Sequence, residues 1–581
     1  MKRIACVPIL AAMLMSLLSS CGGGGGGETP SASPSSVAPP SYEAPVSSAP
    51  IDEIELPLTD EEVEFEYWMP NSQSFEGFAS YDDNLFYQWM EDQTGVSIRW
   101  VHPPVGSEKE NFQTLVLSGD YPDFVHRVAN YYDGGVDKAI SDQFLIRLNE
   151  KVDELMPNYR AVVYSNEETF VQCVSDEGNL WGIYHIVDRP QGSWMGLGVR
   201  QDWLDRAGMT VENCETVDGF EQVLTAFKEY TYGGSGPLWL QGGGLQAASG
   251  LNGSYGVTSV NWTSGFLDVD GKAVYSPLAE GMKPYVAKMA DWYSKGLIHT
   301  GYLAENSWGT PEDRWINSEV GAGEFVYTLA DMFANSAATS SLQPEPNFKL
   351  TAITTPKLNA DDEWSDIHVR QTNDRVRSSF SMGITTDCSD VDLACRYWDY
   401  AWSDEGKIAS NWGPYEGPEG DTNATYFIDE SDANGDGHKE SYQPWLMEKY
   451  DSVTYIQYKV AAMEGPTYSI WSREWSLLDE DQVEFTRIWD RAGADWVWPE
   501  GVTLTNTEGD IASTIIANCN TAFSEWCAEV ITGRKSADTY ETELLPKLQS
   551  MDIDRAVQQY QNALDRYYQR TQFIRADTNQ R

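Results

Sequence analysis

The chain has 581 residues and is strongly acidic, because 89 Asp and Glu against 39 Lys and Arg give a formal net charge of −50. Such a surface repels nucleic acid and anionic lipid, which excludes a nucleic-acid-binding protein and a body that lies flat on a membrane. The length allows two or more compact lobes with sizeable cores.

The first twenty residues have the order of a secretory signal peptide. Met1-Lys2-Arg3 is basic, residues 4–18 are almost wholly apolar, and small residues follow. An apolar run of about fifteen residues is too short to cross a bilayer comfortably, which favours a signal over residues 1–20 and not a transmembrane helix. The ending Leu18-Ser19-Ser20-Cys21 resembles the lipobox of bacterial lipoproteins. That resemblance implies cleavage before Cys21 and an acyl anchor, such as palmitate, on this cysteine. The alternative is an ordinary secretory signal with a chance cysteine.

Residues 21–54 form the next predicted unit. Six glycines, Gly22–Gly27, lead into a segment rich in Ser, Pro and Ala. This composition lacks the apolar residues that offset the entropy lost on ordering a chain, so it predicts a disordered tether between the membrane and a folded body.

The folded body opens with alternating strand and helix patterns. Residues 63–68 and 96–101 alternate as strands do, residues 84–91 and 109–117 read as helices, and a third strand is expected near residue 125. Strand, helix, strand, helix, strand is typical of an α/β domain with a parallel sheet covered by helices.

Cysteines and aromatic residues are the next informative classes. Beyond Cys6 and Cys21 the sequence has Cys173, Cys214, Cys388, Cys395, Cys519 and Cys527, of which 388 with 395 and 519 with 527 could form disulfides. Free buried thiols are the alternative.

Aromatic residues are abundant. The 22 Trp, 31 Tyr and 19 Phe often stand beside Asn, Asp and Gly. Flat rings beside amides suit the apolar face and hydroxyl rim of a sugar, although most aromatics in a protein of this size belong to its core.

Several segments in order along the chain resemble bacterial extracellular solute-binding proteins of family 1, the lipoprotein receptors of carbohydrate ABC importers. Ser118-Gly119-Asp120-Tyr121-Pro122-Asp123 is similar to the family's SGDLPD signature. Further similar segments are Leu145–Glu150, Met156–Tyr159, Gly178–Ile183, Arg200–Leu204, Thr216–Phe227, Gly271–Tyr275, Tyr293–Ile298, Ile531–Arg534 and the amphipathic run 552–568.

This resemblance implies a type II periplasmic-binding protein fold, in which two α/β lobes are joined by a hinge and hold the ligand in an interlobe cleft. Transferred to this chain, lobe one covers 55–190 plus 375–460, and lobe two covers 191–374 plus 461–581. The implied protein is a non-catalytic monomer whose partners are a carbohydrate ligand and the permease subunits of an ABC transporter. It is held on the extracytoplasmic face of the cell membrane by its lipid anchor alone.

One local motif predicts a metal site. Asp432, Asn434 and Asp436 supply oxygens at loop positions 1, 3 and 5, Gly437 follows, and Glu440 stands at position 9, as in an EF-hand loop. His438 would contribute its backbone carbonyl. Position 12 is Gln443 where an EF-hand has a bidentate acid, so we expect a weak structural calcium site that ligand binding does not require. A solvated Asx/Gly turn is the alternative.

Catalytic motifs are absent from the sequence. There is no HExxH, GxSxG or CxxC, and the run Gly242–Gly244 only imitates a dinucleotide fingerprint because no acidic residue follows at the expected distance.

Residues that would meet a sugar are expected in loops at the sheet ends that face the cleft. By that logic the candidates are Trp68, Asn71, Asn130, Tyr131, Tyr132, Trp239, Trp262, Trp412 and Tyr415.

The predicted function is therefore a lipid-anchored receptor that captures a carbohydrate, here an oligosaccharide, and delivers it to an ABC importer. Two alternatives stay open. A surface glycoside hydrolase is also aromatic, acidic and exported, and a peptide receptor would replace the stacking rings with a backbone-pairing groove.

Overall fold

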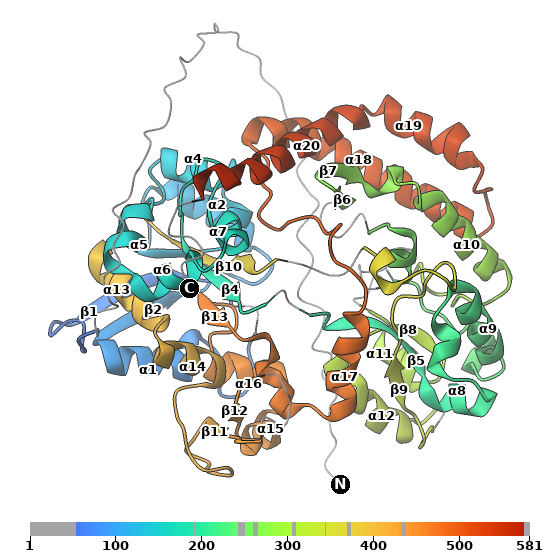
Figure 1. The fold of residues 1–581 in the computed structure, drawn as a ribbon, viewed down its shortest axis with the longest axis horizontal. Coiled ribbons are helices and arrows are strands. Elements are labelled where there is room, and N and C mark those ends of the chain that lie inside the picture. The colour runs from blue at the N-terminus through green and yellow to red at the C-terminus, as the bar shows by residue number, and fades with distance from the viewer. Residues whose placement is uncertain are drawn as a thin grey trace, which may run out of the picture.

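The computed structural model describes residues 54–574, apart from 72, 190–191, 242–249, 260–264, 305–308, 343, 369–373 and 432–436. The chain forms two halves that lie side by side (Figure 1). Each half has its own sheet and its own buried core, and we call them lobe one and lobe two. The predicted two-lobed α/β architecture is confirmed.

Lobe one is built on a six-stranded sheet. In spatial order its strands are β13 (Thr467–Ser469), β4 (Ile183–Val187), β10 (Val376–Ile384), β3 (Phe124–His126), β1 (Val63–Trp68) and β2 (Val96–Val101). Strands β1, β2 and β3 are parallel, as the sequence predicts. Strand β10, which lies outside the segment of that prediction, is antiparallel to both β3 and β4. A separate hairpin pairs β11 (Tyr426–Ile428) with β12 (Glu440–Tyr442).

Helices cover this sheet on both faces. They begin and end where the sequence supplies caps; for example, the Asn84 side chain accepts from the backbone N–H groups of Phe86 and Tyr87, and the helix ends at Gly95 in a left-handed conformation. The helices are α1 (Leu85–Thr94), α2 (Glu108–Ser118), α3 (Val128–Tyr131), α4 (Gly135–Ser141), α5 (Asn149–Leu155), α6 (Pro157–Val163), α7 (Glu167–Cys173), α13 (Val391–Ala401), α14 (Asp404–Trp412), α15 (Pro444–Tyr450) and α16 (Val453–Val460).

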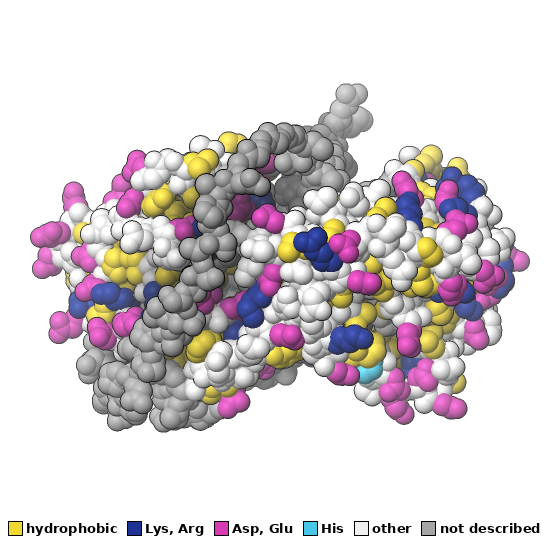
Figure 2. All heavy atoms as spheres, turned by 90° about the horizontal axis from the view of Figure 1, so that it is seen from above, with side chains coloured by type: hydrophobic (Ala, Val, Ile, Leu, Met, Phe, Trp, Pro, Cys, Tyr) yellow, Lys and Arg dark blue, Asp and Glu magenta, His cyan; other side chains and the backbone are white. Residues whose placement is uncertain are grey.

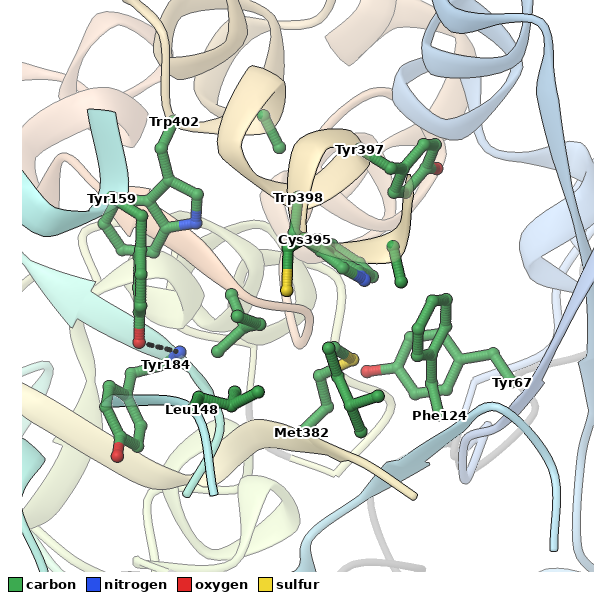
Figure 3. Packing of buried hydrophobic residues seen from close by; sticks show 14 of the residues in the cluster. Tyr67, Phe124, Leu148, Tyr159, Tyr184, Met382, Cys395, Tyr397, Trp398 and Trp402 are labelled. Carbon is green, nitrogen blue, oxygen red and sulfur yellow. Dashed lines mark hydrogen bonds between the residues drawn. The ribbon is translucent and has the colours of Figure 1, made fainter. Parts of the chain in front are cut away.

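The core of lobe one is rich in aromatic side chains. Trp398 of α13 packs edge-on against Tyr67 of β1 and Phe124 of β3, with ring centroids 6.1 and 5.8 Å apart (Figure 3). The backbone N–H of Tyr184 donates to the Tyr159 hydroxyl at 3.1 Å, which satisfies a buried polar group. Large buried rings are thus a main source of stability in this lobe.

Lobe two has a smaller sheet and longer helices. Its sheet has the order β8 (Ala322–Val326), β5 (Met195–Arg200) and β9 (Leu350–Ala352), and β6 (Phe266–Val269) pairs with β7 (Lys272–Tyr275). The helices are α8 (Gln201–Ala207), α9 (Val217–Phe227), α10 (Met282–Ser294), α11 (Glu312–Ile316), α12 (Ala330–Ala338), α17 (Glu480–Trp489), α18 (Asn506–Ile531), α19 (Leu545–Ser550) and α20 (Ile553–Gln569). Within the described part of the chain, no helix is both long and apolar enough to span a membrane.

The chain passes between the lobes after β4, after β9 and after β13. Strand β13 pairs with β4 and so belongs to lobe one, whereas α17 packs its Phe485 and Trp489 against Phe325 of lobe two. The chain was expected to cross from lobe one to lobe two between residues 460 and 461. It crosses between Ser469 and Glu480 instead.

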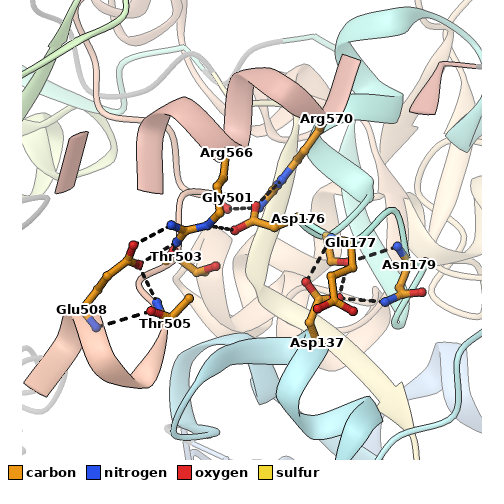
Figure 4. Close-up of polar contacts among 11 residues, drawn as sticks. Asp137, Asp176, Glu177, Asn179, Gly501, Thr503, Thr505, Glu508, Arg566 and Arg570 are labelled. Atoms are coloured by element: carbon orange, nitrogen blue, oxygen red, sulfur yellow. Dashed lines mark hydrogen bonds and ion pairs between the residues drawn. The ribbon is translucent and has the colours of Figure 1, made fainter. Parts of the chain in front are cut away.

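The C-terminal helix α20 of lobe two reaches back to lobe one (Figures 1 and 4). Arg566 donates through Nε to Asp176 of lobe one at 2.8 Å and through its two Nη atoms to Glu508 of α18 at 2.6 and 2.7 Å. Arg570 donates to the other oxygen of Asp176 at 2.8 Å. We call these four residues the interlobe clamp.

Candidate functional site

Five strands of the lobe-one sheet end at the same edge. Strands β1, β2 and β3 are parallel, β3 and β4 are both antiparallel to β10, and β13 is parallel to β4. The residues that follow them therefore line one edge, which we call the carboxyl edge: Met69, His102, Arg127, Asp188 and Ile470. The chain leaves this edge for lobe two after β4 and after β13, so the carboxyl edge faces lobe two.

Arginines from four segments gather at the carboxyl edge. Arg127 follows β3, Arg189 follows β4, Arg473 follows β13, and Arg377 lies at the start of β10, which runs the opposite way. Arg127 adopts a left-handed backbone with φ of 58°, which is uncommon for a non-glycine residue. The ion pairs here are Arg127 with Glu464 at 3.6 Å, Arg189 with Asp188 at 3.4 Å and Arg377 with Glu500 at 3.3 Å.

Two buried histidines lie among these arginines. Burial lowers the pKa of His126, and the charges of Arg127 and His185 lower it further. Burial also lowers the pKa of His185, to about 3; a hydrogen bond with the Gly465 carbonyl opposes this shift, and Arg473 and Arg377 add to it. Both imidazoles are therefore neutral near pH 7, and the positive charge at this edge is carried by guanidinium groups.

A β-bulge adds an aromatic ring to the carboxyl edge. The pairing of β10 with β4 shifts register between Arg377 and Met382. Phe380 lies in this bulge, half-buried, with its ring 5.4 Å from that of His185 and 5.8 Å from the Arg377 guanidinium carbon. Bulges commonly redirect a side chain beside a functional site. Trp471, just beyond β13, is also half-buried, and its backbone N–H donates to Asp188 at 2.9 Å.

Four of the predicted ligand residues follow β1 or β3: Asn71 lies in the loop after β1, Asn130 and Tyr131 lie in the short helix α3 after β3, and Tyr132 caps that helix. Asn71 is half-buried and donates to the Ala79 carbonyl at 3.1 Å, while Asn130 is exposed. Tyr131 is half-buried and lies near Arg127, whose pKa it raises together with Glu464 against the effect of burial. Tyr132 turns away toward Asp142, to which it donates at 2.9 Å. The structure thus brings Tyr131 to the arginines and leaves Tyr132 outside them.

The other predicted rings are not gathered at this edge. Trp68, Trp239 and Trp412 are 2, 1 and 2% exposed and pack inside hydrophobic clusters, where no sugar can stack on them. Tyr415 is 39% exposed, but the carboxylate near its hydroxyl is that of Asp92, in the last turn of α1, which points away from the carboxyl edge. Trp262 lies outside the described residues.

The predicted calcium loop connects β11 and β12. Asp432, Asn434 and Asp436 lie outside the described residues, and the loop is closed by the Asp429 N–H donating to the Lys439 carbonyl at 2.7 Å. Glu440 opens β12, and the His438 ring lies 5.7 Å from that of Trp412. Among the residues that the structure describes, no three His, Cys, Asp or Glu side chains gather as a metal site.

Gln443, at position 12 of that loop, has a structural role. It is fully buried, its amide donates to the carbonyls of Pro418 and Tyr426, and its oxygen accepts from the Gly420 N–H. A side chain held in this way ties the 417–420 loop to the hairpin and is not available as a cation ligand.

Sequence reasoning missed the arginines and Phe380. The signal that could have found Arg127 and Arg189 is a basic residue one or two positions after an apolar strand, as in Val125-His126-Arg127 and Ile186-Val187-Asp188-Arg189. Phe380 carries no such signal, because only the register shift of β10 brings it to the edge.

No protein-family model matches the chain. A curated relative is Lipoprotein LipO of Bacillus subtilis (strain 168), which is 24% identical over 239 residues; the alignment covers 38% of this chain and 43% of LipO. This chain therefore spans less than half of the relative's length in the alignment.

Solved structures match over 87% of this chain and 99% of their own. The alginate-binding protein AlgQ2 without calcium ion has a TM-score of 0.61 at 18% identity. An HMO-binding, ABC-transporter-associated solute-binding protein from Bifidobacterium longum infantis ATCC 15697 has a TM-score of 0.65 at 13% identity. The S. pneumoniae ABC-transporter substrate-binding protein FusA in complex with kestose has a TM-score of 0.62 at 16% identity. The chain therefore has the fold of the ABC-transporter solute-binding proteins.

Proposed function

We propose that this protein is a non-catalytic, lipid-anchored receptor that binds a carbohydrate of several units between its lobes and delivers it to an ABC importer. The observation that carries the proposal is the fold likeness over 87% of the chain to solute-binding proteins that include an alginate-binding, an HMO-binding and a kestose-bound member.

Binding between the lobes follows from the connections. Because the carboxyl edge of lobe one faces lobe two across the connecting segments, a ligand at this edge can contact both lobes. Such a ligand favours the closed arrangement by its higher affinity for it, and the permease then recognises that arrangement.

Among the predicted residues, Asn71, Asn130 and Tyr131 remain the proposed polar and stacking contacts. Phe380 and Trp471 join them as half-buried rings at the carboxyl edge. Rings of this kind contribute affinity by stacking on a pyranose, and amides give direction to its hydroxyls.

The test is a thermal-shift screen of the purified protein against mono- and oligosaccharides, with product analysis of each hit. A ligand that binds only the native state raises the melting temperature by mass action. A shift without product supports the receptor and identifies its cargo. A ligand that raises the melting temperature and is also cleaved would show that the protein is a glycoside hydrolase. A rise in melting temperature with added peptides and with no saccharide would show that it is a peptide receptor.

The proposed anchor is Cys21, which places the folded body on the extracytoplasmic face of the cell membrane. Two or more acyl chains give stable membrane attachment where one does not. Cells fed a clickable palmitate analogue should label the wild-type chain and not a Cys21→Ala variant, which should be released from the membrane fraction. Equal labelling of both chains would place the modification elsewhere.

We also propose that the 432–440 loop binds one calcium ion with a structural role. Its support is the spacing of Asp432, Asn434, Asp436 and Glu440. Calcium should raise the melting temperature of the wild-type protein relative to excess chelator, and the difference should vanish in an Asp432→Ala variant. An equal response in both proteins would assign the effect to another site.

A further inference from the structure

The carboxyl edge has a charge opposite to that of the molecule as a whole. Acidic side chains are spread over both lobes on the face seen in Figure 2, as the net charge of −50 requires. At the carboxyl edge, however, Arg127, Arg189, Arg377 and Arg473 converge, and Arg375 stands beside them at the start of β10.

Three of the five arginines at this edge form an ion pair, and the buried acid Asp374 lies beside Arg375 and near Arg377. Glu464, Asp188 and Glu500 each pair with one arginine. Across the described ranges, neither Arg375 nor Arg473 has a carboxylate within ion-pair distance. Nε of Arg473 is buried without a hydrogen-bond partner. Burial lowers the pKa of Arg473, the direction expected for a cation whose lost hydration is not fully replaced.

The arginines divide into structural and exposed members. Arg375 donates to the carbonyls of Val187 and Asp188, so it fastens the end of β4 and is not free to bind a ligand. The side chains of Arg127, Arg189 and Arg377 are 23, 41 and 21% exposed and keep part of their guanidinium surface at the edge.

These exposed arginines lie together. Arg377 on β10 and Arg127 after β3 belong to paired strands, and Arg377 and His185 both lie against Phe380, at 5.8 and 5.4 Å from its ring. Arg189 donates to Ser472, the neighbour of Arg473, at 3.0 Å. Two half-buried residues with large rings adjoin them: the Phe380 ring packs near Arg377, and the backbone N–H of Trp471 donates to Asp188, the neighbour of Arg189.

We infer that the ligand is an acidic carbohydrate, whose carboxylate groups are bound by Arg127, Arg189 and Arg377 while Phe380 and Trp471 face its rings. A planar guanidinium binds a carboxylate through two parallel hydrogen bonds, which no hydroxyl reproduces. A neutral sugar offers no acceptor of opposite charge to the guanidinium surface that these three arginines keep exposed. This inference rests on the proposed carbohydrate-binding function.

The experiment is calorimetric titration of the full-length protein with a panel of uronate oligosaccharides, each paired with its methyl ester. The ester keeps the sugar, linkage and length and removes the charge. We expect the acid to bind about tenfold or more tightly than its ester, because a charge-assisted pair is lost in the ester. The advantage should shrink as salt is raised, because salt screens charges that are partly exposed.

Two variants locate the effect. Arg189→Gln and Arg377→Gln should each weaken binding of the acid by about tenfold and leave binding of the ester nearly unchanged. The matched control is Arg555→Gln, which removes an equal charge from an α20 side chain that is 58% exposed. Circular dichroism of each variant confirms folding, and Arg189→Gln is the milder change because Arg189 is the most exposed of the three.

The outcomes separate this inference from the function on which it rests. Equal binding of acid and ester, binding of neutral oligosaccharides alone, or unchanged affinity in both arginine variants would overturn the acidic ligand and leave a carbohydrate receptor. Failure of every acidic and neutral oligosaccharide to bind would overturn both.

Discussion

Asp374 is a buried acid at the point where the chain re-enters lobe one. It accepts the Glu500 N–H at 2.6 Å, and burial, with a smaller contribution from the charge of Glu500, raises its pKa to about 7. In the unfolded chain the pKa of Asp is about 4. Between these values the folded state holds a proton that the unfolded state releases, so the contribution of Asp374 to stability falls as pH rises from about 4 to about 7.

Asp374→Asn should therefore stabilise the protein increasingly as pH rises through this window, by roughly 1 kcal/mol or more near pH 7, because Asn stays neutral and can still accept from Glu500. Melting temperatures of variant and wild type measured between pH 4 and 8 test this. Asp404→Asn, at a fully exposed position, should show no such trend. A constant offset for Asp374→Asn would contradict the expected titration.

Two glycines should respond in opposite directions to alanine. A Cβ on Gly198, in the central strand β5, would lie 2.1 Å from Phe325 Cε1 and 3.0 Å from the Thr351 carbonyl, whereas a Cβ on Gly509 of α18 meets nothing within 4 Å. Gly198→Ala should cost about 1–3 kcal/mol through overpacking. Gly509→Ala should gain about 0.5–1 kcal/mol from helix propensity. Denaturant unfolding measures both, and a stable Gly198→Ala protein would show that Phe325 can move.

For single residues, the sequence predicted which residues follow a strand better than it predicted whether their side chains are buried or exposed. Trp68 and Asn71 both follow the same strand, yet Trp68 folds back onto Phe112 and bonds to Asn111, whereas Asn71 stays in the loop. A strand covered by helices on both faces buries residues on either side of its end, so position after a strand does not decide whether a ring meets solvent.

At the level of elements, α20 should depend on the interlobe clamp. Arg566→Gln leaves Asp176 and Glu508, whose side chains are 15 and 10% exposed, without their shared partner. Loss of one member of a partly buried ion network should destabilise the protein by about 2–3 kcal/mol. Limited proteolysis should then release the C-terminal segment earlier than in the wild type.

The control for the clamp is again Arg555→Gln, on the exposed face of the same helix. Its ion pair with Asp552, at 3.7 Å, is worth little at such exposure, so proteolysis and melting temperature should stay as in the wild type. If both variants lowered the melting temperature equally, the stability of α20 would depend on the number of charges on the helix and not on its contact with lobe one.

Strands and helices were predicted correctly where the pattern of apolar residues within the segment itself indicates them. The strands at 63–68 and 96–101 and the helix over 552–568 are present within a few residues of their predicted ends. Strand β10 was not foreseen as the antiparallel centre of the sheet, because its bulge breaks the alternation of Val376-Arg377-Ser378-Ser379-Phe380 and its partners are distant in sequence. Long-range pairing of this kind leaves no mark on a single segment.

At the level of the whole molecule, stability should not depend on redox conditions. The six cysteines within the described residues are all free thiols, so the paired alternative for 388 with 395 and 519 with 527 is wrong. Burial raises the pKa of Cys395 and Cys527 to about 12, which keeps both as unreactive thiols. The melting temperature should be the same with and without reductant, and a drop in reductant would reveal a disulfide.

The strand order of lobe one also bears on how the protein is made. Strand β10, which joins β4 to β3, is synthesised almost 200 residues after β4, and β13 at the edge comes later still. A chain emerging from the ribosome therefore cannot complete this sheet until most of its length exists, and contacts so distant in sequence form slowly. The sheet of lobe one therefore stays open at its centre until β10 has been made, after strands β5 to β9 of lobe two have already emerged.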